Sequence, residues 1–137
     1  MGEVRTEVTL VNIEDTIKAK NGLIPKTEIR QLTVNAVVDT GAWTLVINEA
    51  IREKLGLGVK EKGETTVAGG GKIPSRITEY VEIRWKDRNT ACEAVVLSDE
   101  EEVLVGAYPL EGLDLMIHPK TNEVVGAHGD KRYNVVK

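Results

Sequence analysis

The feature that most constrains the fold is an apolar run that leads directly into a tight turn. Residues 34–38 have the sequence Val-Asn-Ala-Val-Val, and Asp39, Thr40, Gly41 and Ala42 follow them. β-Branched residues favour a strand, and glycine allows the backbone to turn sharply. The strand would place the Asp39 carboxylate at the edge of the core, close to the Thr40 hydroxyl and the Gly41 N–H. Taken alone, such a turn is also common at strand ends in β-rich proteins.

The remaining sequence predicts a mainly β protein with short strands. Phenylalanine is absent, glycine occurs 13 times, and turn residues separate most apolar segments. Val4, Thr6, Val8 and Leu10 alternate with polar residues, which is the period of a strand with one solvent-exposed face. Further strands are expected at residues 16–20, 29–38, 43–47, 65–68, 73–85 and 91–97.

One segment carries clear helix signals. Asn48 is suited to cap the N-terminus of a helix, and Gly56 is suited to end it. Ile51 and Leu55 are four residues apart, so both would lie on one face. The pattern therefore predicts a short helix between Asn48 and Gly56.

The last part of the sequence predicts a second short helix and a hairpin. Residues 109–113 could form the helix, since they follow an apolar run that ends in a glycine. Segments 115–118 and 123–125 are apolar and flank the sequence Pro-Lys-Thr-Asn at 119–122, which favours a turn. These two segments are expected to pair.

Charge and cysteine content argue against several classes of protein. The formal net charge is −4, without a basic run, so a nucleic-acid partner is not expected. Cys92 is the only cysteine, which excludes an internal disulfide. The N-terminus has no long apolar stretch of the signal-peptide or membrane-span type. We expect one domain over residues 1–137, in the cytoplasm and without a membrane partner.

Residues that commonly hold metals or act as nucleophiles are sparse. The spacing of His118 and His128 does not fit a metal site, and both are expected in solvent-facing loops. Cys92 lies in an apolar segment without a nearby histidine and is interpreted as a core residue. Residues 99–102 form an acidic run that is typical of a solvated loop. No metal, no cofactor and no Ser-His-Asp triad is expected.

Two motifs taken together resemble a known family. Val37 to Ala42 resembles the catalytic loop of retropepsin-like aspartic proteases. Val103 to Gly106 is similar to the apolar segment with a final glycine that passes behind that loop in the family. Gly106 follows Asp39 by about 67 residues, which leaves room for the flap hairpin, with Gly69 to Gly71 at its tip. The resemblance extends from about residue 29 to 125 and is greatest for bacterial single-domain members.

The resemblance implies a fold and a mechanism. The fold would be a closed β barrel with a flap hairpin and one or two short helices, and it would form a homodimer. The sequence holds one Asp-Thr-Gly, so a two-fold dimer would supply the second carboxylate of an aspartic endopeptidase. Asp39, Thr40 and Gly41 would then form the catalytic turn.

The same resemblance implies where a substrate would lie. Ala42, Trp43 and the tip glycines Gly69, Gly70 and Gly71 would contact a peptide or protein substrate. Trp43 departs from the family pattern, in which Ser or Asp follows the alanine. Ala107 and Tyr108 follow Gly106, where the retroviral enzymes carry Arg and Asn.

Two other functions fit the same residues. A dimeric peptide-binding module with this fold but without catalysis is suggested by Trp43. An unrelated β-rich binding domain would require the Asp39 turn to be coincidental, and the second motif at Val103 to Gly106 argues against that interpretation.

Overall fold

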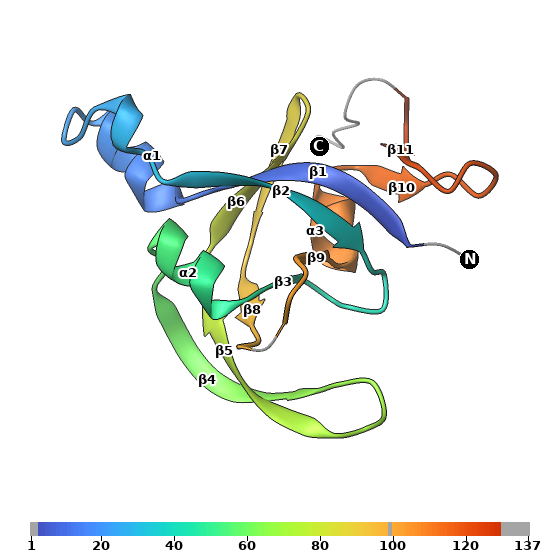
Figure 1. Cartoon of the computed structure of the whole chain (residues 1–137). Helices are drawn as coiled ribbons and strands as arrows, with labels where there is room; N and C mark the ends of the chain where they lie inside the picture. Colours follow the sequence, from blue (N-terminus) through green and yellow to red (C-terminus); the bar gives the residue numbers. More distant parts are fainter. Residues whose placement is uncertain (1–2, 99, 130–137) are drawn as a thin grey trace, which may run out of the picture.

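The structure is a computed structural model that describes residues 3–98 and 100–129, and it is mainly β (Figure 1). The strands are β1 (Val4–Val11), β2 (Gln31–Val38), β3 (Leu45–Ile47), β4 (Val59–Thr66), β5 (Lys72–Thr78), β6 (Val81–Trp85), β7 (Arg88–Cys92), β8 (Ala94–Val96), β9 (Leu104–Val105), β10 (Leu115–Ile117) and β11 (Val124–Gly126). The helices are α1 (Ile13–Lys20), α2 (Glu49–Leu55), α3 (Ala107–Gly112) and the 3-10 helix η1 (Lys26–Glu28). Among the described helices, none has the length and apolar character needed to cross a membrane.

Nine strands form one sheet in the order β4-β5-β8-β3-β9-β2-β1-β6-β7, and β10 pairs with β11 in a separate hairpin. The sheet curls so that β1 and β2 lie opposite the β4–β5 hairpin (Figure 1). Within the described residues, β4 and β7 remain its two edges. The closed barrel expected from the sequence is therefore wrong. The exposed β4 edge carries charged side chains, which discourage further strand pairing.

The centre of the sheet determines where the Asp39 turn lies. Strand β9 pairs in parallel with β2 on one side and antiparallel with β3 on the other. The connection from β2 to β3 must therefore cross the end of β9. Because Asp39 lies in that connection, the fold brings it beside the segment that leads from β9 into α3.

The core beneath this crossing is apolar and closely packed. Leu10, Leu45, Ile47, Leu55 and Ile83 have no exposed surface. Burial of each such side chain contributes about 1.5–3 kcal/mol relative to leaving it in water. Ala36 and Val38 of β2 belong to the same core cluster, so the core fixes both β2 and β3, the two strands that carry the turn.

Helix α2 and the terminal elements confirm the sequence predictions. The Asn48 side chain accepts a hydrogen bond from the Ile51 N–H, and Gly56 adopts the left-handed conformation that ends the helix. The expected helix near residues 109–113 is α3, and the expected final hairpin is β10–β11.

The strand expected at residues 16–20 is wrong, because this segment belongs to helix α1. The Asn12 side chain accepts from the Asp15 N–H and caps the helix. Arg30 then binds the Asp15 carboxylate through its side chain and its backbone N–H. The described residues thus contain three α-helices, whereas one or two were expected.

Two long strands expected from the sequence are each divided. Residues 73–85 form β5 and β6, and residues 91–97 form β7 and β8. Each break accompanies a change of partners, since β5 pairs with β4 and β8 whereas β6 pairs with β1 and β7. A continuous strand could not join both sets of neighbours.

Candidate active site

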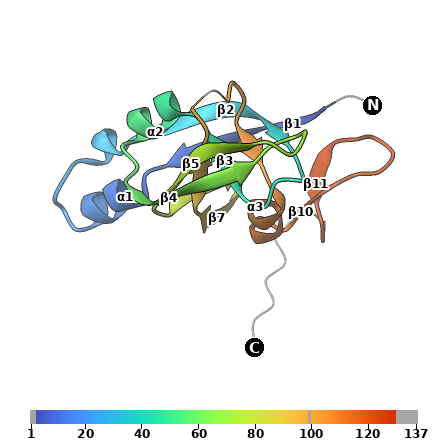
Figure 2. The ribbon, with the colours of Figure 1, turned by 90° about the horizontal axis from the view of Figure 1, so that it is seen from below.

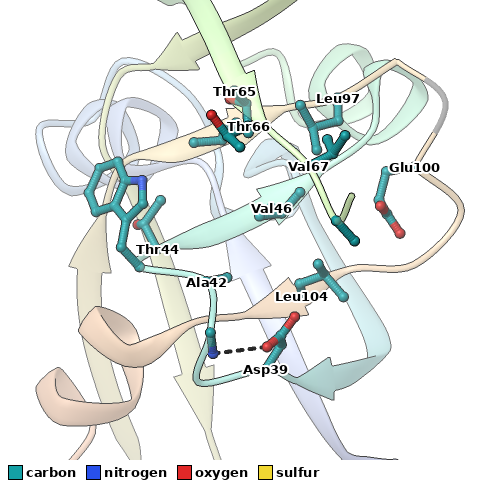
Figure 3. A pocket seen from close by; sticks show the side chains of 14 residues that line it. Asp39, Ala42, Thr44, Val46, Thr65, Thr66, Val67, Leu97, Glu100 and Leu104 are labelled. Atoms are coloured by element: carbon teal, nitrogen blue, oxygen red, sulfur yellow. Dashed lines mark hydrogen bonds between the residues drawn. The ribbon is translucent and has the colours of Figure 1, made fainter. Parts of the chain in front are cut away.

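Asp39 is exposed at the end of β2, and backbone hydrogen bonds hold its turn. The Asp39 N–H donates to the carbonyl of Val105 (3.0 Å), and the Ala42 N–H donates to the carbonyl of Asp39 (3.0 Å). The Gly41 N–H donates to Oδ1 of Asp39 at 2.9 Å (Figure 3). The carboxylate is thus oriented by the turn that carries it, as the sequence predicted for the Gly41 donor.

Gly106 lies directly behind this turn. Its N–H donates to the carbonyl of Thr44 (3.1 Å), and the next N–H, of Ala107, donates to the carbonyl of Ala42 (2.9 Å). A Cβ atom at Gly106 would lie 2.4 Å from the Thr44 oxygen and 2.5 Å from the Ala42 oxygen. Only glycine allows this approach, which explains why the apolar run at residues 103–105 ends in one.

Thr44 fixes the far end of the turn. It is buried, and its hydroxyl donates to the carbonyl of Glu93 at 2.7 Å. The Tyr108 N–H also donates to the carbonyl of Trp43 (2.9 Å). The backbone on both sides of Trp43 is therefore held, while its side chain is 56% exposed.

A cavity of about 590 Å³ opens between the Asp39 turn and the β4–β5 hairpin. More of its wall is apolar than polar, and Figure 3 shows the lining side chains. The lining comprises Asp39, Gly41, Ala42, Trp43, Thr44, Val46, Thr65, Thr66, Val67, Ala68, Val95, Leu97, Glu100 and Leu104. Val46, Val95 and Leu97 pack together as a small apolar cluster beneath it. A concave apolar site with few polar groups is typical of ligand binding.

The structure places the sequence-predicted site residues unequally. Asp39, Gly41, Ala42 and Trp43 line the cavity. The hydroxyl of Thr40 is exposed and forms no hydrogen bond within the part of the chain that the structure describes. The lining does not include Gly69, Gly70 or Gly71, which form the hairpin tip beyond Ala68.

Residues of the hairpin arm and of the loop before β9 were missed by the sequence analysis. Thr65 to Ala68 contribute four residues to the lining in place of the tip glycines. Glu100 also lines the cavity, although the acidic run around it indicated a solvated loop. Strand alternation places every second residue of an arm on one face, but the sequence does not show which face the fold turns toward Asp39.

The other candidate nucleophile and metal ligands lie apart from the cavity. Cys92 is fully buried, and this burial raises the pKa of its thiol to about 11, so it is a core residue as predicted. His128 contacts the Asp114 carboxylate at 2.8 Å. Across residues 3–98 and 100–129, no three His, Cys, Asp or Glu side chains gather as a metal site would need.

Comparison with known proteins agrees with this geometry. An aspartyl protease family matches residues 26–108, which include the Asp39 turn, the hairpin and Gly106. Among curated proteins, none matches the sequence. Structures with a similar fold include the EIAV protease complexed with the inhibitor HBY-793, at 24% sequence identity and a TM-score of 0.55. That match covers 80% of this chain and 86% of the viral chain. The fold is thus similar to that of a retroviral protease, and the chain belongs to the aspartyl protease family.

Proposed function

We propose that the chain is a single-domain aspartic endopeptidase that acts as a homodimer. The observation that carries this proposal is the exposed Asp39 carboxylate, oriented by the Gly41 N–H at the mouth of an apolar cavity. Thr65 to Ala68 of the hairpin form one wall of the cavity. An extended peptide could lie in it with a backbone carbonyl close to Asp39.

A dimer is proposed because each chain carries one Asp-Thr-Gly turn. A two-fold interface brings the same residue of both subunits to its axis. The start of β1, the turn after β2, the hairpin tip and β10–β11 all lie toward the same side in two perpendicular views (Figures 1 and 2). The exposed side chains of Trp43, in the turn after β2, and Met116, in β10, belong to this group of segments. Pairing through that side would bring the two Asp39 carboxylates together.

The proposed chemistry divides two roles between two identical residues. The ionised Asp39 accepts a proton from a water molecule, and the water oxygen attacks the carbonyl carbon of the peptide bond. The partner's Asp39 is protonated and donates its proton to the carbonyl oxygen. Two adjacent carboxylates share one proton because both cannot ionise easily side by side. The Gly41 N–H orients the carboxylate, with Thr40 beside it in the turn, and the hairpin tip at residues 69–71 closes over the peptide.

A dimeric peptide-binding module without catalysis is the second candidate. Trp43 favours it, because a large aromatic side chain, 56% exposed, lines the cavity directly after the Asp-Thr-Gly-Ala turn. Such a residue could contribute binding area without assisting a reaction. The two candidates differ in whether bound peptides are cleaved.

Replacement of Asp39 by Asn tests the proposal, because it removes the ionisable group and nearly preserves its shape. We expect the wild type to cleave a peptide library and Asp39→Asn to lose cleavage at least about a hundredfold. Asp87→Asn is the matched control, since Asp87 is exposed in the β6–β7 turn and does not line the cavity. Sedimentation should show dimers for all three proteins. Equal cleavage by wild type and Asp39→Asn would contradict the proposal, and peptide binding without cleavage would favour the binding module.

A further inference from the structure

Glu100 is the second carboxylate of the cavity and comes from the loop between β8 and β9. Its backbone is fixed at two points. The Glu100 N–H donates to the carbonyl of Leu97 (3.1 Å), and its carbonyl accepts from Nδ2 of Asn48 (3.1 Å). Asn48 also caps helix α2. The side chain therefore starts from an anchored position, and in Figure 3 Leu104 is drawn between it and Asp39.

The acidic neighbour Glu102 points elsewhere. Its carboxylate binds Arg5 at 2.7 Å on the surface, and its N–H makes a long contact of 3.3 Å with Oε1 of Glu100. Within the described residues, this long contact is the one hydrogen bond that the Glu100 carboxylate accepts. Neither lysine nor arginine occurs in the lining of the cavity. A half-buried carboxylate thus faces an apolar cleft without a cationic partner in the described chain.

A cationic group of a ligand would complete this arrangement. Lysine and arginine have long apolar stems that can lie along apolar walls while their charged ends reach a carboxylate. Leu104 and Leu97 supply such walls beside Glu100. An anionic side chain at the same place would be repelled, and an apolar side chain would leave the carboxylate partly desolvated and unpaired.

We propose that Glu100 makes the cleft selective for peptides with a lysine or arginine near the cleavage site. The proposal rests on the endopeptidase function and names its substrate class. In a two-fold dimer the cleft holds two copies of Glu100, one for each half of the peptide. The preference for a basic residue therefore falls at two positions placed symmetrically about the cleaved bond.

The test compares peptides that carry lysine or norleucine at a single position, since norleucine keeps the apolar stem and lacks the charge. We expect kcat/KM of the wild type to favour lysine by about three- to tenfold at the two symmetric positions, as a partly screened ion pair would. Glu100→Gln should remove the preference, Glu100→Arg should disfavour lysine, and added salt should reduce the wild-type preference. Glu101→Gln, an exposed neighbour outside the lining, should keep it.

Two results separate this inference from the proposed function. If Asp39→Asn loses cleavage but the wild type prefers norleucine or Glu100→Gln retains the lysine preference, the inference is overturned and the endopeptidase stands. If no peptide is cleaved, the endopeptidase proposal fails. The Glu100 selectivity is then decided by measuring how the same peptides bind to Asp39→Asn, with and without the Glu100→Gln change. Tryptophan fluorescence can report that binding, because Trp43 lines the cavity and Trp85 is buried. The inference about Glu100 would be overturned if lysine peptides bound no better than norleucine peptides, or if neither bound.

Discussion

The Asp39 turn and the β4–β5 hairpin face the same cavity, but the rest of the protein holds them very differently. Strand β9 and the start of helix α3 bind the turn through the backbone groups of Val105, Gly106 and Ala107. The hairpin tip is closed by its own bonds, from the Val67 N–H to the Gly71 carbonyl and from the Gly70 N–H to the Val67 carbonyl. Strand β4 is almost entirely exposed.

Under the proposed function, this difference would suit the two walls of the cleft to separate tasks. A carboxylate that must meet a reacting atom benefits from a backbone that is already in place. A wall that must admit a peptide and then cover it benefits from weak local constraints. The base of the hairpin is attached more firmly than its tip, because β5 pairs with β8 there and Arg76 of β5 and Lys60 of β4 pair with Glu49 and Glu93.

A glycine-to-alanine substitution should have a much larger effect on the free energy of unfolding behind the Asp39 turn than at the hairpin tip, and this is the largest contrast that we expect. In Gly106→Ala, the new Cβ would overlap backbone oxygens that cannot rotate away, so we expect a loss of about 3 kcal/mol in the free energy of unfolding. In Gly71→Ala, the Cβ would lie 3.9 Å from the Val67 side chain, and φ is not positive. That change should alter stability by less than about 0.5 kcal/mol. Urea unfolding measures both values, and similar losses would contradict the comparison.

Hydrogen exchange should show the second largest contrast. The N–H groups of Asp39 and Gly106 are bonded to the carbonyls of Val105 and Thr44. We expect their protection factors to exceed those of residues 69–71 by at least about a hundredfold. Hairpin amides as well protected as those of the turn would show that the tip is not the mobile wall.

The ion pairs of Glu49 at the base of the β4–β5 hairpin should have a smaller effect on stability. Its carboxylate binds Arg52 (2.7 and 2.9 Å) and also Arg76. Arg52 first, and Arg76 in addition, lower the pKa of Glu49 from 4.5 to about 2. After allowance for solvent screening, we expect Glu49→Gln to cost about 1 kcal/mol at neutral pH and to speed exchange in β5.

The sign of the pH dependence follows from the lowered pKa. The unfolded chain binds the proton of Glu49 more readily than the folded chain, so the ion pair stabilises the fold above about pH 4.5. This contribution is lost as the pH falls from about 4.5 towards 2. The stability difference between wild type and Glu49→Gln should therefore shrink over that range. Glu53→Gln, an exposed change on the same helix, is the control, and a constant difference would argue against the pairing.

The sequence predicted those parts of the fold that local chemistry determines. Asn48 and Gly56 have side-chain and backbone requirements that place α2 directly. The cap of α1 by Asn12 was equally local, but the β-branched residues Thr16 and Ile17 suggested a strand instead. The open sheet could not be predicted, because it depends on which strands remain unpaired after the chain has folded.

The sequence predicted the turn of the candidate site, but it did not predict the other residues that line the cavity. Asp39 and Gly106 lie in short motifs whose spacing is visible in the sequence. Val67 and Glu100 approach the cavity only through the pairing of β4 with β5 and the path of the loop before β9. The tip glycines are conspicuous in the sequence, but the cavity is lined by the arm below them.

A mixing experiment tests the central claim, that two Asp39 residues from different subunits form one site. Equal amounts of wild type and Asp39→Asn are allowed to exchange subunits, and peptide cleavage is compared with that of the same total concentration of wild type. Random pairing leaves about a quarter of the dimers with two Asp39 carboxylates, so the predicted activity is about a quarter. Mixing with Asp87→Asn should leave the activity unchanged. A residual activity of about half, as expected for subunits that act alone, would contradict the shared site.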